Sequence, residues 1–144
     1  MICSVELPVR YLQYSNCFDF DFVIASTCLE NEEYKNYFIE ARNTSKDRLM
    51  ILDNGAFETG EAIPDEQYLE LAAQLRPDIL VIPDKFKDNA ATGNRAIDFL
   101  AKWKGSPIKG VELMGVLQGT TIDQIMGLYS IIYKPAGVKY YGLG

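Results

Sequence analysis

Five short apolar runs recur at regular intervals along the chain. They cover residues 22–25, 49–52, 79–83, 113–117 and 138–141. Runs that are apolar at every position are typical of parallel strands whose two faces are both buried. We therefore predict five parallel strands that begin roughly 25 to 34 residues apart, which is about the length of a βα repeat.

Segments with a helical spacing of apolar residues lie between these runs. Apolar side chains recur every three or four positions at 34–41, 68–75, 97–101 and 122–133, which predicts four amphipathic helices. Helix ends are marked by Pro64, Pro77, Gly105 and Gly137. The predicted order is βαβαβαβαβ, which indicates an α/β fold.

Two architectures fit this order, an open sheet with helices on both faces and a barrel with every helix outside. No glycine-rich phosphate loop of the nucleotide-binding type follows the first run, which favours the barrel. A complete eight-stranded barrel needs about 200 residues or more. We therefore expect a single domain over residues 1–144, with five strands and four helices of an incomplete TIM-like barrel.

The two ends of this domain are expected to differ from its repeats. Residues 1–21 form no repeat unit, and we interpret them as an N-terminal extension that acts as a lid or plug over the barrel bottom. The fifth strand would have unpaired backbone on one side, which favours pairing with another chain. We therefore expect a homo-oligomer, or a partner chain that completes the barrel.

The composition, 48% hydrophobic, is that of a globular protein. No apolar run approaches the ~20 residues that span a bilayer and no leader precedes the runs, so we expect a cytoplasmic protein without a membrane partner. The net charge is -6, yet residues 84–144 have 8 basic and 5 acidic residues. Six residues form this basic side, which would suit a nucleic acid but is also typical of solvated helix faces: Lys85, Lys87, Arg95, Lys102, Lys104 and Lys109.

Histidine is absent from the chain, and Cys3, Cys17 and Cys28 stand apart from one another. Ser-His and Cys-His dyads are therefore excluded, and no C-x-x-C pair is present for a zinc site. We expect reduced structural thiols, with no metal and no cofactor bound by this chain. Carboxylates, Lys, Tyr and Cys are left to perform any chemistry.

Two carboxylates follow neighbouring predicted strands. Asp53 ends the second run and Asp84 follows the third. Adjacent parallel strands lie about 5 Å apart, so both side chains can share one pocket at the carboxyl edge of the sheet. Paired acids raise each other's proton affinity, which suits proton transfer or recognition of a donor-rich ring. The alternative is that both residues are turn formers that cap the next helix.

Other residues at the strand ends suit a flat ligand. The Gln118 amide can donate and accept toward a purine-like edge, or it can bond to a neighbouring loop. Gly55, Gly119 and Gly142 allow the backbone to approach a ring closely. Phe57 offers a face for stacking, or it simply packs under its loop.

Four of these segments resemble, in order, elements of the queuine and archaeosine tRNA-ribosyltransferases, the tRNA-guanine transglycosylase family. Residues 51–57, Ile-Leu-Asp-Asn-Gly-Ala-Phe, are similar to its D-S-G-G-[FY] element, and Asp84 falls where it has a base-recognising aspartate. Residues 116–119 resemble its V-Q-G element and residues 141–144 its G-G-L/G-L-A strand end. The resemblance implies a pentosyltransferase that exchanges guanine for a 7-deazaguanine in tRNA, or in DNA as in phage and bacterial relatives.

The resemblance also implies a role for each matched residue. Asp53 would be catalytic and would transfer a proton near the reacting base. Asn54 would hold the ring and Phe57 would stack on it. The hydrogen-bonding edge of the base would be recognised by Asp84, Gln118, Gly119 and Gly142.

The chain departs from the family in two respects. Asn54 and Ala56 stand where the family has a small Ser and a Gly, and the family's nucleophilic aspartate and zinc ligands would lie beyond residue 144. We therefore expect a transglycosylase that needs further strands or a partner chain for activity. The alternatives are a non-catalytic nucleobase-binding remnant, or an open α/β domain that binds a small metabolite or a protein.

Overall fold

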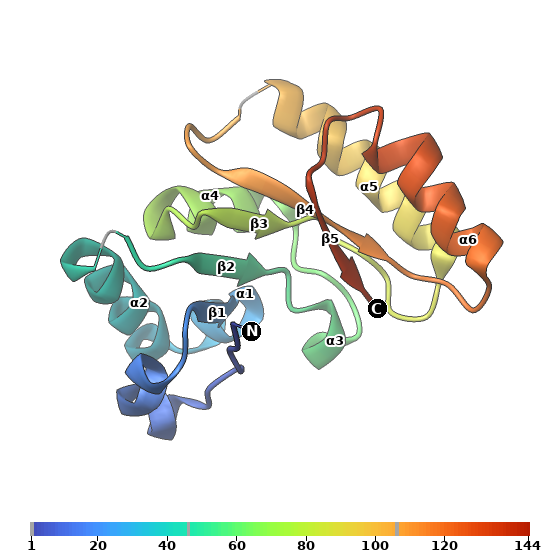
Figure 1. Ribbon diagram of the computed structural model, residues 1–144. Coiled ribbons are helices and arrows are strands. Elements are labelled where there is room, and N and C mark those ends of the chain that lie inside the picture. The colour runs from blue at the N-terminus through green and yellow to red at the C-terminus, as the bar shows by residue number, and fades with distance from the viewer. Residues whose placement is uncertain (1, 46, 106) are drawn as a thin grey trace.

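The computed structural model describes residues 2–45, 47–105 and 107–144 and contains one five-stranded sheet (Figure 1). Its strands are β1 (Asp21–Ile24), β2 (Met50–Asp53), β3 (Ile79–Val81), β4 (Glu112–Leu117) and β5 (Tyr140–Leu143). Every neighbouring pair is parallel, and the order is β1-β2-β3-β4-β5. The predicted α/β class and the five parallel strands are therefore confirmed.

Helices connect all of these strands. The predicted helical stripes correspond to α2 (Glu32–Thr44), α4 (Asp65–Leu75), α5 (Asn89–Gly105) and α6 (Ile122–Gly127), which continues into the π-helical segment η2 (Leu128–Tyr133). Two further helices follow strands directly, α1 (Ala25–Glu30) and α3 (Ala56–Thr59). The prediction of four helices was too low because these two are too short to show a periodic stripe. No helix in the described ranges is both long and apolar enough to cross a bilayer.

The helices cover one face of the sheet. Strand side chains such as Val23, Leu52 and Leu80 lie in a core that they share with helical residues. On the other face Ile51, Ile79 and Val81 pack against further side chains from the strands or from the residues just before them. Among the described residues, no helical side chain joins this second cluster, so we call this side of the sheet the open face.

The N-terminal segment is attached at the start of β1. Its 3-10 helix, η1 (Val9–Cys17), packs on α2. Arg48 donates to the carbonyls of Ser15 and Phe18, each at 2.8 Å, and pairs with the buried Asp21 at 2.9 Å. These bonds hold the extension beside the amino end of β1.

Candidate functional site

A cavity of about 270 Å³ lies on the open face at the carboxyl ends of the strands. Small-molecule sites usually measure about 300 to 1,000 Å³, so the cavity suits a ligand at the small end of that range. Five of the seven predicted site residues line it: Asp53, Phe57, Asp84, Gln118 and Gly142. Its apolar wall includes Phe22, Met114 and Val116.

Asp53 is the last residue of β2 and lines the cavity. Its Oδ1 accepts a hydrogen bond from the Gly55 N–H at 2.9 Å, and no donor from the described residues reaches Oδ2. Burial raises the pKa of Asp53 to about 6; the Gly55 bond opposes this rise, whereas the charges of Glu58 and Asp84 add to it. A carboxyl group with this pKa can take up or release a proton near neutral pH.

The turn after Asp53 requires glycine at position 55. Gly55 has a left-handed backbone with φ of 77°, and a Cβ there would lie 2.9 Å from the Ser26 Cβ. Ser26, from α1, is buried beneath the turn. Gly55 was predicted to let the backbone approach a ligand ring. The close approach in the structure is instead to Ser26 of α1.

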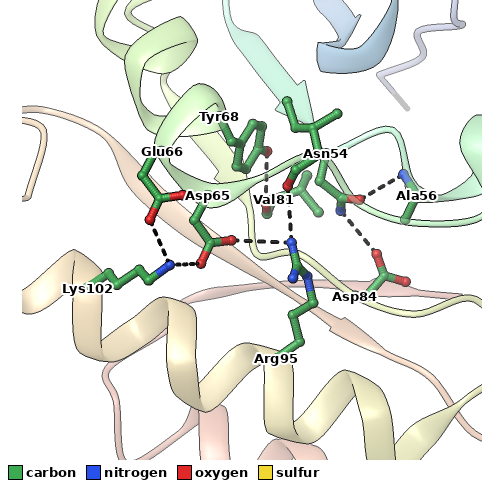
Figure 2. A network of polar contacts seen from close by, with 10 residues as sticks. Asn54, Ala56, Asp65, Glu66, Tyr68, Val81, Asp84, Arg95 and Lys102 are labelled. Atoms are coloured by element: carbon green, nitrogen blue, oxygen red, sulfur yellow. Dashed lines mark hydrogen bonds and ion pairs between the residues drawn. The ribbon is translucent and has the colours of Figure 1, made fainter.

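Asp84 follows β3 and is held by two side-chain amides. The Asn54 Nδ2 donates to its Oδ1 at 3.0 Å, and the Gln118 Nε2 donates to its Oδ2 at 2.8 Å. All three side chains are buried. Figure 2 shows the Asn54–Asp84 bond together with the bond that the Ala56 N–H donates to the Asn54 Oδ1. The two amides therefore set the orientation of the Asp84 carboxylate.

Two predicted site residues, Asn54 and Gly119, do not line the cavity. Asn54 is 1% exposed and lies behind Asp84, to which it donates. Gly119 lies against the start of α6, where a Cβ would be 3.0 Å from the Gln124 Cβ. Asn54 therefore supports Asp84, and neither residue lines the cavity.

Two phenylalanines form an aromatic rim at the cavity mouth. The rings of Phe57 and Phe86 are 5.2 Å apart in an edge-to-face arrangement, and Phe57 is 71% exposed. The Lys87 ammonium lies 4.9 Å from the centre of the Phe86 ring. Sequence reasoning missed Phe86, although an aromatic residue two positions after Asp84 was an available signal. Both rings are accessible to a planar ligand or to its neighbouring groups.

The loop between β3 and α5, which presents Phe86, is attached at two points. The Thr92 hydroxyl accepts from the Lys85 N–H and donates to the Lys85 carbonyl, both at 3.0 Å. The Lys87 N–H donates to the Gln118 Oε1 at 3.3 Å. These bonds hold the rim relative to the Asp84–Gln118 pair.

Three of the six residues of the predicted basic side are paired with acids. Arg95 and Lys102 from α5 contact Asp65 at 3.3 and 2.7 Å, and Lys102 also contacts Glu66 at 3.1 Å (Figure 2). Lys85 is paired with an acid of the loop before α4. These pairs connect elements of the fold and reduce the local positive charge that phosphates would need.

No protein-family model and no curated protein matches this chain. Within residues 2–45, 47–105 and 107–144, no group of three or more acidic or cysteine side chains could hold a metal ion. The three cysteines are free thiols, and Cys28 is buried. The cavity lining includes Asp53, Asp84, Gln118, Phe57 and Phe86, which supply carboxyl, amide and aromatic groups.

Proposed function

We propose that the cavity binds a planar heterocyclic base, and that the chain is the base-binding part of a nucleobase-exchanging glycosyltransferase. The reaction would replace guanine with a 7-deazaguanine in tRNA or DNA. The main support is that Asp53 and Asp84 line one small cavity beside the exposed Phe57. Acceptors, a titrating acid and an aromatic face are the groups that a fused, donor-rich ring requires.

The two carboxyl groups suit opposite sides of guanine. The Asp84 carboxylate can accept from N1–H and the 2-amino group. On the far side of guanine, N7 has a lone pair. Asp53 must therefore donate there, which it can do when it is protonated. In base exchange the bond between base and ribose breaks and the departing base takes up a proton, which Asp53 can supply.

The architecture supports the wider assignment to a TIM-like barrel. The strands follow one another in sequential order, all parallel, and the helices cover one face. This is the arrangement of consecutive βα units in a barrel, and barrel enzymes place their active sites at the carboxyl ends of the strands. The five strands would then be part of the barrel wall, completed by further strands or by a partner chain.

A calorimetric titration with guanine, whose N7 supplies the acceptor on that far side, tests the proposal. We expect binding that tightens by about three- to tenfold between pH 7.5 and pH 5.5, because Asp53 becomes a donor as it takes up its proton. In Asp53→Asn the amide donates at every pH, so the affinity should not vary over this range. The matched control is Asp98→Asn, which removes an exposed charge on α5 and should keep the wild-type pH profile. A wild-type chain that binds no purine or deazapurine base would refute the proposal.

A non-catalytic base-binding protein is the second candidate. It is favoured because the carboxylates among the described cavity residues are Asp53 and Asp84, and both have roles toward the base. A covalent exchange needs a further nucleophile that attacks the sugar. Incorporation of labelled guanine into tRNA or duplex DNA, abolished by Asp53→Asn, would exclude this candidate, whereas base binding without incorporation would support it.

A further inference from the structure

We propose that Asn54 and Gln118 act as a clamp on Asp84, and that this carboxylate recognises the ligand while Asn54 only positions it. The inference rests on the proposed base-binding function and adds to it two residues that position the recognising carboxylate. The site would select rings that have an N–H beside an amino group, as guanine and 7-deazaguanine do.

Asn54 can influence a ligand only through Asp84. Both ends of its amide are used inside the protein, because Oδ1 accepts from the Ala56 N–H at 2.8 Å and Nδ2 donates to Asp84 at 3.0 Å. The side chain is 1% exposed and does not line the cavity. Asn54 is therefore a positioning residue, and direct contact with the base is left to other groups.

Gln118 lines the cavity, and both ends of its amide already bond within the protein. The Lys87 N–H donates to Oε1, and Nε2 points to the Asp84 carboxylate. The Asn89 side chain donates to the Gln118 carbonyl at 2.6 Å, which holds the backbone as well. Because the amide nitrogen is turned toward Asp84, the charged Asp84 carboxylate is the stronger acceptor for a donor-rich edge.

The clamp leaves Asp84 suited to two donors at once. A carboxylate oxygen can accept two hydrogen bonds, and each oxygen of Asp84 already accepts one, from Asn54 or from Gln118. One further acceptor position remains on each oxygen. Two adjacent N–H donors of a ring can fill these positions as a bidentate pair, in the way that Arg pairs with a carboxylate.

The test compares 7-deazaguanine with 7-deazahypoxanthine, which differ only in the 2-amino group. We expect the wild-type chain to prefer 7-deazaguanine by about tenfold or more, since a hydrogen bond to a charged group is lost without the amino group. Asn54→Asp keeps an acceptor for the Ala56 N–H, removes the donor to Asp84 and adds a like charge. The preference should then fall close to one, while Asn94→Asp, at an exposed position on α5, should leave it unchanged.

Several outcomes would overturn the inference. A wild-type chain that binds both rings equally, or an Asn54→Asp variant that weakens both by the same factor, would mean that Asn54 is only structural. If circular dichroism shows that Asn54→Asp is unfolded, Asn54→Ser replaces it, because a hydroxyl can still cap the Ala56 N–H but cannot span to Asp84. An unchanged preference in Asn54→Ser would equally overturn it. Failure of the wild-type chain to bind either ring refutes the proposed function instead.

Discussion

Asp53 is the residue whose ionisation the fold changes most clearly among the cavity groups. An aspartate in an unfolded chain has a pKa near 3.9, whereas burial raises the pKa of Asp53 to about 6. Its contribution to stability is therefore complete below pH ~4 and is lost as the pH rises through about 6. We expect Asp53→Asn to increase the free energy of unfolding by about 1–3 kcal/mol at pH 7.5 and by little at pH 4. Urea denaturation at both pH values measures the difference.

The control for this measurement is Asp98→Asn, which changes the same charge at an exposed position. It should alter stability by less than about 0.5 kcal/mol at either pH. An Asp53→Asn variant whose effect is the same at pH 4 and pH 7.5 would contradict the raised pKa. It would point instead to altered packing around the Gly55 turn.

The positions of side chains at the strand ends could be predicted from the sequence. The orientation of side chains that depends on loop paths could not. Asp53 and Asp84 could be placed together because the ends of adjacent parallel strands share one edge of the sheet. The direction in which the Asn54 and Gln118 amides turn depends on loop N–H groups, and periodicity contains no information on loop paths. The same reason explains why the contact of Phe86 with Phe57 was not predicted.

At the scale of elements, α4 connects β2 and β3 near their carboxyl ends. The fully buried hydroxyl of Tyr68 is shared between the carbonyls of Leu52 and Val81, at 2.8 and 2.9 Å (Figure 2 shows the bond to Val81). We expect Tyr68→Phe to lower the free energy of unfolding by about 1–3 kcal/mol, because buried carbonyls lose their partner while the ring is kept. Urea denaturation measures this, with the exposed Tyr11→Phe as the matched control.

If Tyr68→Phe is as stable as Tyr11→Phe, the hydroxyl is not needed to satisfy the two strands. A loss of stability without weaker binding of 7-deazaguanine would show that Tyr68 supports the fold alone. A loss of both would show that the β2 and β3 ends must be held together for the cavity to keep its shape. Measuring both quantities therefore shows whether Tyr68 of α4 contributes to the stability of the fold alone or also to ligand binding in the cavity.

Helices long enough to show an apolar stripe were predictable, and local departures from regular helix were not. The stripe at 122–133 indicated one helix, whereas the chain changes from α6 to the π-helical η2 at Leu128. The Tyr133 ring packs against Gly115 of β4, where a Cβ would lie 2.8 Å from the ring. A contact between a helix and a strand distant in sequence can change the helical winding, and periodicity cannot detect it.

For the whole molecule, the charge distribution read from the sequence overstated the exposed basic surface. The positive excess in residues 84–144 remains, but Lys85, Arg95 and Lys102 are each paired with an acid. Exposed pairs contribute little to stability, yet they lower the potential that attracts phosphates. A nucleic-acid acceptor therefore stays a prediction of the family resemblance. Lys87 is the basic residue beside the cavity mouth that could contact a phosphate.

The open face and the β5 edge lead us to expect that the chain self-associates. Residues 3 and 4 run beside the start of β1 and bond to residues 19 and 20, whereas β5 pairs with β4 alone in the described part of the chain. Tyr140 pairs in register with Met114 of the open face and is 43% exposed. An uncovered strand edge beside an apolar face is a template for pairing with another chain.

Sedimentation velocity over a concentration series measures this association. The wild-type chain should form dimers or larger species at micromolar concentration. Tyr140→Lys should shift it toward monomer, because the change places a charge on the open face beside the free edge. Tyr11→Lys is the matched control, since Tyr11 is 42% exposed on η1, far along the sheet from β5, and should keep the wild-type association. A wild-type chain that sediments as a monomer throughout would mean that the open face needs no cover, and would count against a barrel completed by other strands.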